Sequence, residues 1–91
     1  MIRGFRCDET KRLFETGRGR RFAAIALRKL DQLEHVTMLR SLAIPAGNRL
    51  EALTGDRIGQ FSIRINDQRR VCFRWTDEGP TDVEIVDYHR G

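Results

Sequence analysis

Residues 60–75, with the sequence QFSIRINDQRRVCFRW, constrain the fold more than any other stretch of this chain. Apolar side chains alternate with polar or cationic ones on both sides of a polar turn, a pattern typical of a β-hairpin with one oily and one cationic face. If the Asn-Asp-Gln triplet forms the loop, Ile63 lies opposite Val71 and Arg64 lies opposite Arg70. A one-residue slip would carry one strand's apolar set to the wrong face, so the pattern predicts this register.

The predicted register places Arg64 and Arg70 next to each other on the cationic face. Like charges directly opposed across a sheet are destabilising, and a purely structural surface would tend to interleave acids there. We therefore expect an anion to complete this pair. A phosphate fits best, because the planar guanidinium group binds phosphate through two hydrogen bonds at once.

The charge composition favours the same kind of partner. Of the 91 residues, 17 are Lys or Arg and 13 are Asp or Glu, which gives a net charge of +4 and a pI near 9.8. Fifteen of the cations are arginine, whose planar fork suits phosphates and bases, so RNA or DNA is favoured as a partner. With 40% hydrophobic residues, the chain has material for one small core. We expect a single α+β domain over residues 1–91.

Other classes of protein are disfavoured by the sequence. No apolar run is long enough for a membrane helix, and the N-terminus lacks the apolar core of a signal peptide, so we expect a cytoplasmic protein with no membrane partner. Cys7 and Cys72 do not have zinc spacing, and we interpret both as ordinary buried or half-buried thiols in a reducing compartment. We expect neither a metal nor a cofactor.

The periodicity of the chain changes once, from helical to alternating. Residues 1–6 suit a short first strand, and Asp8 is the expected N-cap of a helix over 8–16. Apolar residues at three- and four-residue steps predict a second helix over 21–35, which must cover the sheet. Thr37 is expected to cap a brief turn after it. The β region that follows comprises a strand at 48–53, a turn at 55–59, the hairpin, a turn at 77–80 and a final strand at 81–89. The predicted order is β-α-α-β-β-β-β.

Several of these segments together resemble a known family. The stretch RLEALTGDRIGQFSIRINDQRRVCFRW, followed after a short turn by VEIVDYH, is similar to the HigB/GraT branch of the RelE-like bacterial toxins, also called the plasmid maintenance system killer family. The resemblance includes MIRGFRCDETKRLFETG at the N-terminus and covers essentially the whole chain. It implies a RelE-like fold, in which a small, mostly antiparallel sheet is packed against two N-terminal helices.

The resemblance also implies a function and partners. The chain would be the toxin of a type II toxin-antitoxin system and a ribosome-dependent endonuclease that cuts mRNA in the decoding site of the small ribosomal subunit. The implied partners are ribosome-bound mRNA and a HigA-type antitoxin with a helix-turn-helix domain, and operator DNA would be reached only through that antitoxin. The alternative is a translation inhibitor that binds RNA or the ribosome and cuts weakly or not at all.

RNA cleavage without a metal uses the ribose 2′-hydroxyl as nucleophile, so it needs a base, an acid and cations that stabilise the charged phosphorane. His89 matches the terminal Asp-Tyr-His of the family and is the candidate acid or base, because imidazole has an ordinary pKa near neutrality. Tyr88 can stack on a base or donate to phosphate, although regular alternation would place it on the opposite face. Arg70 matches an arginine of the family and is the candidate phosphate clamp, with Arg64 as its helper.

The sequence departs from the family pattern in two places. Residues 51–54 read EALT, where some members carry His-Pro-Leu-Lys, so a carboxylate replaces a base and a cation. Glu51 is a candidate general base, but a carboxylate near arginines more often forms a salt bridge. Because this chain lacks the base and the cation of those relatives, we expect modest nuclease activity. Arg69 stands where relatives have tryptophan. By alternation, the Arg69 side chain points to the oily face of the hairpin. Burying a guanidinium there without a partner would be costly, so we predict that this end of the hairpin is exposed to water.

The remaining candidates are basic residues and one histidine. The candidate RNA contacts are Arg18, Arg20, Arg21, Arg49, Arg57 and Arg74. The first three form a basic loop before the second helix that could bind ribosomal or messenger phosphates. The alternative interpretation is a run of charged residues that is simply exposed to solvent. His35, at the end of the second helix, is expected to cap the helix C-terminus rather than to do chemistry.

Overall fold

The architecture consists of two helices followed by an antiparallel sheet, in a computed structural model that describes residues 1–18 and 23–87. The helices are α1 (Asp8–Thr16) and α2 (Ala23–His35). The sheet has the spatial order β1 (Glu51–Ala52), β2 (Gln60–Arg64), β3 (Arg69–Thr76) and β4 (Gly79–Asp87), and each neighbouring pair is antiparallel. The described residues also contain three short 3-10 helices, η1 (Leu39–Ala43), η2 (Ala46–Asn48) and η3 (Gly55–Arg57). The predicted α+β class is confirmed.

Strands β2 and β3 pair in the register that the alternation predicts. Ile63 lies opposite Val71, and Arg64 lies opposite Arg70. Phe61 also faces Phe73, with ring centroids 6.2 Å apart and ring planes inclined by 29°. The two apolar rows of the hairpin therefore lie together on one face of the sheet, and Arg64, Arg70 and Arg74 lie on the other.

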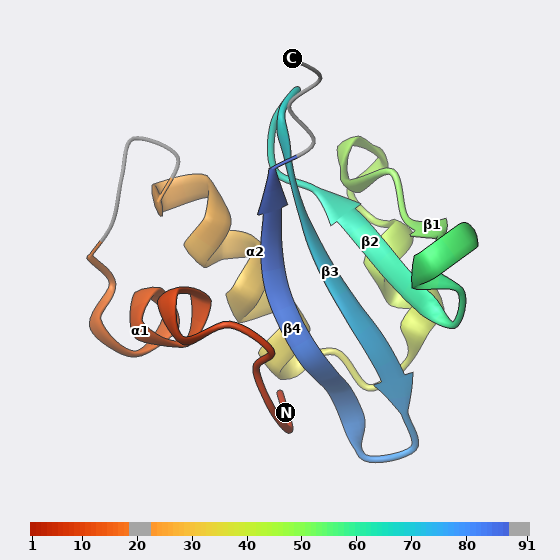
Figure 1. The fold of residues 1–91 in the computed structure, drawn as a ribbon, viewed down its shortest axis with the longest axis horizontal. Coiled ribbons are helices and arrows are strands. Elements are labelled where there is room, and N and C mark those ends of the chain that lie inside the picture. The colour runs from red at the N-terminus through yellow and green to blue at the C-terminus, as the bar shows by residue number, and fades with distance from the viewer. Residues whose placement is uncertain (19–22, 88–91) are drawn as a thin grey trace.

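Helix α2 covers the oily face of the sheet. In Figure 1 it passes behind β4, while α1 stands to the side of that strand. The apolar stripe of α2 repeats at four- and three-residue steps, and its members Ala26, Leu30 and Leu33 have no exposed surface. They share one core with Ile63, Val71, Phe73 and Val83. Burial of each large apolar side chain stabilises the fold by about 1.5–3 kcal/mol, so this layer fixes which face of the hairpin is left for polar groups.

The N-terminal segment is not the strand expected at residues 1–6. Only Phe5 bridges to the sheet, parallel to Val83 of β4, and the Val83 N–H donates to the Gly4 carbonyl over 3.1 Å. Asp82, beside the bridge, has a left-handed backbone with φ 52°. This conformation interrupts the regular ladder, so the expected strand is reduced to a single bridge.

Two expected helix caps are also wrong. Asp8 is the first residue of α1, and Cys7, with extended backbone, stands at the N-cap position without a side-chain bond. A carboxylate in the first turn still interacts favourably with the helix dipole. Met38, not Thr37, precedes η1. His35 is the last residue of α2, as predicted, and its Nδ1 lies 2.9 Å from the Asp31 carbonyl oxygen. Residues 21–22 of the predicted second helix lie outside the described residues.

The expected strand at 48–53 is shortened to two residues. Asn48 belongs to η2 and is fully buried. Arg49 then takes a left-handed conformation with φ 45°, which departs from regular strand geometry. Pairing with β2 therefore begins only at Glu51.

Asn48 links α2 to the chain segment before β1. Its amide nitrogen donates to Gln32 Oε1 over 2.9 Å and to the Leu42 carbonyl over 3.0 Å. Its Oδ1 accepts a short hydrogen bond from Lys29 Nζ. Burial lowers the pKa of the Lys29 ammonium below its usual value, with a smaller contribution from neighbouring Arg28. The Asn48 oxygen compensates part of that desolvation.

The two cysteines are placed as interpreted. Cys7 is half-buried and Cys72 is buried, and no disulfide joins them. No helix in the described part of the chain is long and apolar enough to cross a membrane. Within residues 1–18 and 23–87, no group of three or more His, Cys, Asp or Glu side chains is placed to hold a metal ion.

We predict that Asn48→Ala lowers the free energy of unfolding by about 1–3 kcal/mol, because it leaves buried polar partners unsatisfied. Urea denaturation measures the change. The control is Gln68→Ala, whose side chain is exposed in the hairpin loop and whose loss is expected to change stability by less than about 0.5 kcal/mol. Equal stability of the two variants would contradict the linking role of Asn48.

Candidate functional site

The polar face of the sheet is organised around one row of residues that crosses all four strands. Glu51, Ser62, Cys72 and Glu84 are successive partners in the strand pairing. Ser62 and Cys72 have no exposed surface, although they lie on the face opposite α2. The long arginine side chains of the same face cover this row, so it forms the floor of the candidate site.

Arg70 is held in place by three groups from two other segments. Its Nε donates to Ser62 Oγ over 2.7 Å, and its Nη2 donates to the Arg49 carbonyl over 2.6 Å. The same Nη2 lies 3.9 Å from Glu51 Oε1. Only 14% of the Arg70 side chain is exposed. The guanidinium is therefore fixed by the protein rather than mobile in solvent.

The facing arginines do have acidic neighbours, which corrects the expectation from the sequence. Arg64 pairs with Asp67 in the hairpin loop, and Arg70 lies near Glu51 on the next strand. These acids come from a loop and from an adjacent strand, so alternation within the hairpin does not reveal them. Both are largely in water, with 92% and 57% of their side chains exposed. Exposed ion pairs of this kind contribute little, about 0–1 kcal/mol.

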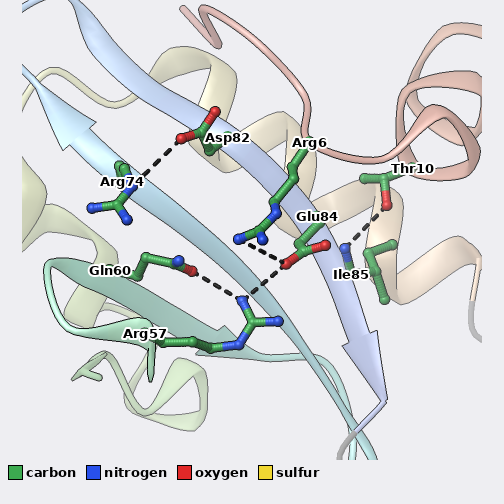
Figure 2. A network of polar contacts seen from close by, with 8 residues as sticks. All are labelled: Arg6, Thr10, Arg57, Gln60, Arg74, Asp82, Glu84 and Ile85. Carbon is green, nitrogen blue, oxygen red and sulfur yellow. Dashed lines mark hydrogen bonds and ion pairs between the residues drawn. The ribbon is translucent and has the colours of Figure 1, made fainter. Parts of the chain in front are cut away.

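A second set of charges on the same face spans β2 to β4. Arg57, which ends η3, donates from Nη1 to Gln60 Oε1 over 3.0 Å and to Glu84 Oε1 over 2.9 Å. Gln60 belongs to β2 and Glu84 to β4, so the Arg57 guanidinium lies over β3 between them (Figure 2). Arg6 Nη1 approaches the same Glu84 oxygen at 3.9 Å. We call Arg6, Arg57, Gln60 and Glu84 the Glu84 cluster.

A bulge in β4 places the carboxylate that pairs with Arg74. Cys72 pairs with Glu84, but Arg74 pairs with Thr81, so two residues of β4 oppose a single residue of β3. Asp82 is one of them, and its carboxylate lies 3.4 Å from Arg74 Nε (Figure 2). The left-handed backbone of Asp82 is a common device for re-aiming a side chain at a bulge.

The end of the hairpin is exposed to water, as predicted, because Gln68 is exposed and 92% of the Asp67 side chain is exposed. Arg69 itself is half-buried. Only 22% of its side chain is exposed, and its Nη2 lies 3.8 Å from Asp87 Oδ2. The two residues are direct partners in the pairing of β3 with β4. A carboxylate from the neighbouring strand thus accompanies the half-buried guanidinium, a partner that the sequence did not suggest.

The remaining predicted site residues are distributed differently. Tyr88, His89, Arg20 and Arg21 lie outside the described residues. Arg18 is exposed and follows α1, whose contact with the sheet is with β4, so it is not part of the arrangement around Arg70. The Arg49 side chain is exposed, and it is the Arg49 carbonyl that contacts Arg70. The structure therefore brings together Arg64, Arg70 and Glu51, while Arg74 lies further along β3 and the Arg57 guanidinium lies over β3 between Gln60 and Glu84.

Sequence reasoning missed four residues of this face, which are Ser62, Gln60, Glu84 and Arg6. Ser62 has the same parity as Arg64 in the hairpin, and this signal places it next to the arginines. Glu84 could not be placed, because its partner on β3 depends on a bulge that alternation does not show. Arg6 reaches the site only through the bridge of Phe5 to β4.

The comparisons with known proteins assign the family. Residues 3–89 match the family described as the RelE-like toxin of the type II toxin-antitoxin system HigB. The chain belongs to this family. Fifty residues are 46% identical to Toxin HigB-1 of Vibrio cholerae serotype O1, over 55% of this chain and 53% of that toxin. The chain thus matches about half the length of this curated relative. The resemblance noted from the sequence is confirmed, and the protein is a RelE-like toxin of the HigB type.

Solved structures share the fold at low sequence identity. The YoeB-YefM complex from Staphylococcus aureus contains a chain with a TM-score of 0.58 and 18% identity, covering 99% of this chain and 97% of that one. A YoeB/ParE toxin from Agrobacterium tumefaciens gives a TM-score of 0.52 and 20% identity, with 98% of each chain covered. The predicted RelE-like fold is confirmed.

We predict that Ser62→Ala destabilises the protein, because the Arg70 Nε–H loses its acceptor in a largely buried position. The expected loss is about 1–3 kcal/mol, and in a domain of this size each kcal/mol lowers Tm by about 4–8 °C. Thermal unfolding followed by circular dichroism measures it. Thr54→Ala, at an exposed position before η3, is the matched control. A Tm of Ser62→Ala equal to that of the control would show that the Arg70–Ser62 bond does not hold the site together.

Proposed function

We propose that this toxin is a ribosome-dependent endoribonuclease that cleaves mRNA and thereby inhibits translation. One observation carries the proposal, namely the fixed guanidinium of Arg70 on a polar face that also presents Arg64 and Glu51. A cation held by Ser62 and the Arg49 carbonyl needs no reorganisation when negative charge develops. Preorganised donors of this kind are among the strongest contributors to transition-state stabilisation.

The proposed chemistry divides the work among a few side chains. The 2′-oxygen forms a bond to the adjacent phosphorus, and the bond from phosphorus to the 5′-oxygen breaks. A base accepts the 2′-proton, and an acid protonates the leaving 5′-oxygen. Arg70 and Arg64 stabilise the phosphorane, His89 transfers a proton, and Tyr88 stacks on a base or donates to phosphate. Glu51, 3.9 Å from Arg70, serves as a salt-bridge partner rather than as the base.

The proposed partners follow from the family. The Staphylococcus aureus structure is a complex of YoeB with YefM, and we propose that this toxin likewise binds an antitoxin, of the HigA helix-turn-helix type, through which operator DNA is contacted. The proposed location is the cytoplasm, where the ribosome supplies the message. The RNA contacts proposed on the toxin are Arg18, Arg20, Arg21, Arg49, Arg57 and Arg74.

The second candidate function is a translation inhibitor that binds RNA or the ribosome with weak cleavage. The observation in its favour is the number of carboxylates on the same face. Glu51, Asp67, Asp82 and Glu84 each lie within 4 Å of an arginine nitrogen. Such pairing reduces the positive potential that would stabilise a phosphorane. RNA binding through shape and hydrogen bonds depends less on that potential, so it is weakened less.

We predict that Arg70→Ala abolishes site-specific cleavage of a message in a translation extract, read as 3′ ends by primer extension. Loss of one transition-state donor lowers kcat by about 10²–10³. Arg70→Lys keeps the positive charge but not the planar guanidinium, so this variant is expected to retain more of the RNA binding than of the cleavage. Because Arg70 also supports the fold, thermal unfolding of both variants accompanies the assay.

The control for this assay is Arg12→Ala, which removes an exposed arginine from α1 and is expected to leave cleavage unchanged. Translation arrest by the wild-type toxin with intact message would reject the nuclease and favour the binding inhibitor. Normal cleavage by a folded Arg70→Ala protein would reject Arg70 as the phosphate clamp.

We predict that His89→Ala lowers the cleavage rate by about 10²–10⁴, the usual contribution of a positioned acid or base. The wild-type rate is expected to change across the ordinary imidazole pKa of about 6.5, and the variant is expected to lose that dependence. Single-turnover cleavage on programmed ribosomes between pH 5.5 and 8.5 measures both effects. A pH profile unchanged by the substitution would assign the proton transfer to another group.

A further inference from the structure

The Glu84 cluster joins three segments that are far apart in sequence. Arg6 comes from the N-terminal segment, Arg57 from the end of η3, and Glu84 from the middle of β4. The two guanidinium groups meet at one carboxylate oxygen, Glu84 Oε1, at 2.9 Å from Arg57 and 3.9 Å from Arg6. Figure 2 shows both arginine side chains extending over the polar face toward this oxygen.

The charged side chains of the cluster differ in how much of their surface is exposed to solvent. Of the three charged side chains, Glu84 is the most buried, with 16% exposed, compared with 30% for Arg57 and 56% for Arg6. The arginines thus stand between the carboxylate and the solvent. An anion that approaches this face meets guanidinium groups first and leaves the buried carboxylate in place.

The charges of the cluster leave room for such an anion. Two arginines share one carboxylate, so the cluster carries a net charge of +1. Arg57 is firmly fixed, because its Nη1 donates to both Glu84 and Gln60. Arg6 is more than half exposed, and its 3.9 Å approach to Glu84 is longer than a hydrogen bond. One fixed and one adjustable guanidinium suit the two free oxygens of an RNA phosphate.

We propose that Arg6 and Arg57 form a second phosphate-binding site for RNA, and that Glu84 is the positioning residue that holds the two guanidinium groups together. The proposal rests on the proposed function, because it assumes that RNA binds this face at Arg70. The two sites belong to one surface, since Ser62 under Arg70 and Glu84 under Arg57 lie in the same row across the sheet. Ser62 and Glu84 are two strands apart in the sheet, about 10 Å, a span that a short single strand of RNA covers.

The first test counts phosphate contacts through the salt dependence of binding. The probe is a fluorescent single-stranded RNA with 2′-O-methyl riboses, which cannot supply the nucleophile. For single strands, each phosphate contact contributes about 0.7 to the slope of log K against log salt. Arg6→Ala is expected to reduce the slope by about this amount and to weaken binding equally for different sequences. Arg12→Ala is expected to bind as the wild type does.

The second test separates positioning by Glu84 from its charge. Glu84→Gln and Glu84→Ala remove the same negative charge, but only glutamine keeps an oxygen that can accept from Arg57. We expect Glu84→Ala to bind the probe more weakly than Glu84→Gln, and this difference to shrink when Arg6 is also replaced by alanine. Equal affinity of the Gln and Ala variants would overturn the positioning role. If Glu84→Ala fails to fold, the Arg6→Ala slope still decides whether the site exists.

The outcomes also distinguish this site from the proposed function. A wild-type toxin without salt-dependent binding of the probe, in parallel with no cleavage on ribosomes, would overturn both. A wild-type toxin that binds, with Arg70→Ala weakened but Arg6→Ala identical to Arg12→Ala, would overturn the second site alone. A reduced slope in Arg6→Ala supports the second site whether or not Arg70→Ala affects cleavage.

Discussion

The pairing of Ile63 with Val71 decides where every other side chain of the central hairpin points. Successive residues of a strand alternate between the two faces of the sheet. Burial of these two residues against α2 therefore sends Ser62, Arg70 and Cys72 to the opposite face. A shift of one residue would expose apolar side chains worth about 1.5–3 kcal/mol each and would place guanidinium groups in the core. The arginine-bearing face is thus a consequence of how the core is built.

Arginines that lie flat on a sheet lose part of their hydration and need protein partners in exchange. Arg70 has a serine oxygen and a backbone carbonyl, and Arg57 has an amide oxygen and a carboxylate. These contacts have two effects. They offset desolvation, which supports the fold, and they hold each guanidinium in one orientation, which is what a phosphate site requires. Stability and preorganisation therefore cannot be varied independently on this face, and Ser62 contributes to both.

The parts of the fold that the sequence predicted are those governed by local periodicity. The bounds of α1, the stripe of α2 and the register of β2 with β3 all follow from spacing within one segment. The missed features need contacts between distant segments. The β4 bulge beside the Phe5 bridge sets the position of Glu84, and buried Asn48 ends the expected strand early by bonding to Gln32 and Leu42. Arg70 and Arg64 were therefore found from the sequence, whereas the carboxylates that accompany the arginines, apart from Glu51, were not.

These carboxylates differ in depth, and the difference bears on how the face can bind RNA. Asp67 and Glu51 are mostly in water, where salt screens them strongly. Glu84 is largely covered, so salt screens it less and it offsets part of the charge of the arginines above it. A face balanced in this way attracts distant nucleic acid weakly but presents fixed guanidinium groups to a phosphate already nearby. Such an arrangement suits the proposed function, in which the ribosome would position the RNA and the protein would need geometry more than long-range attraction.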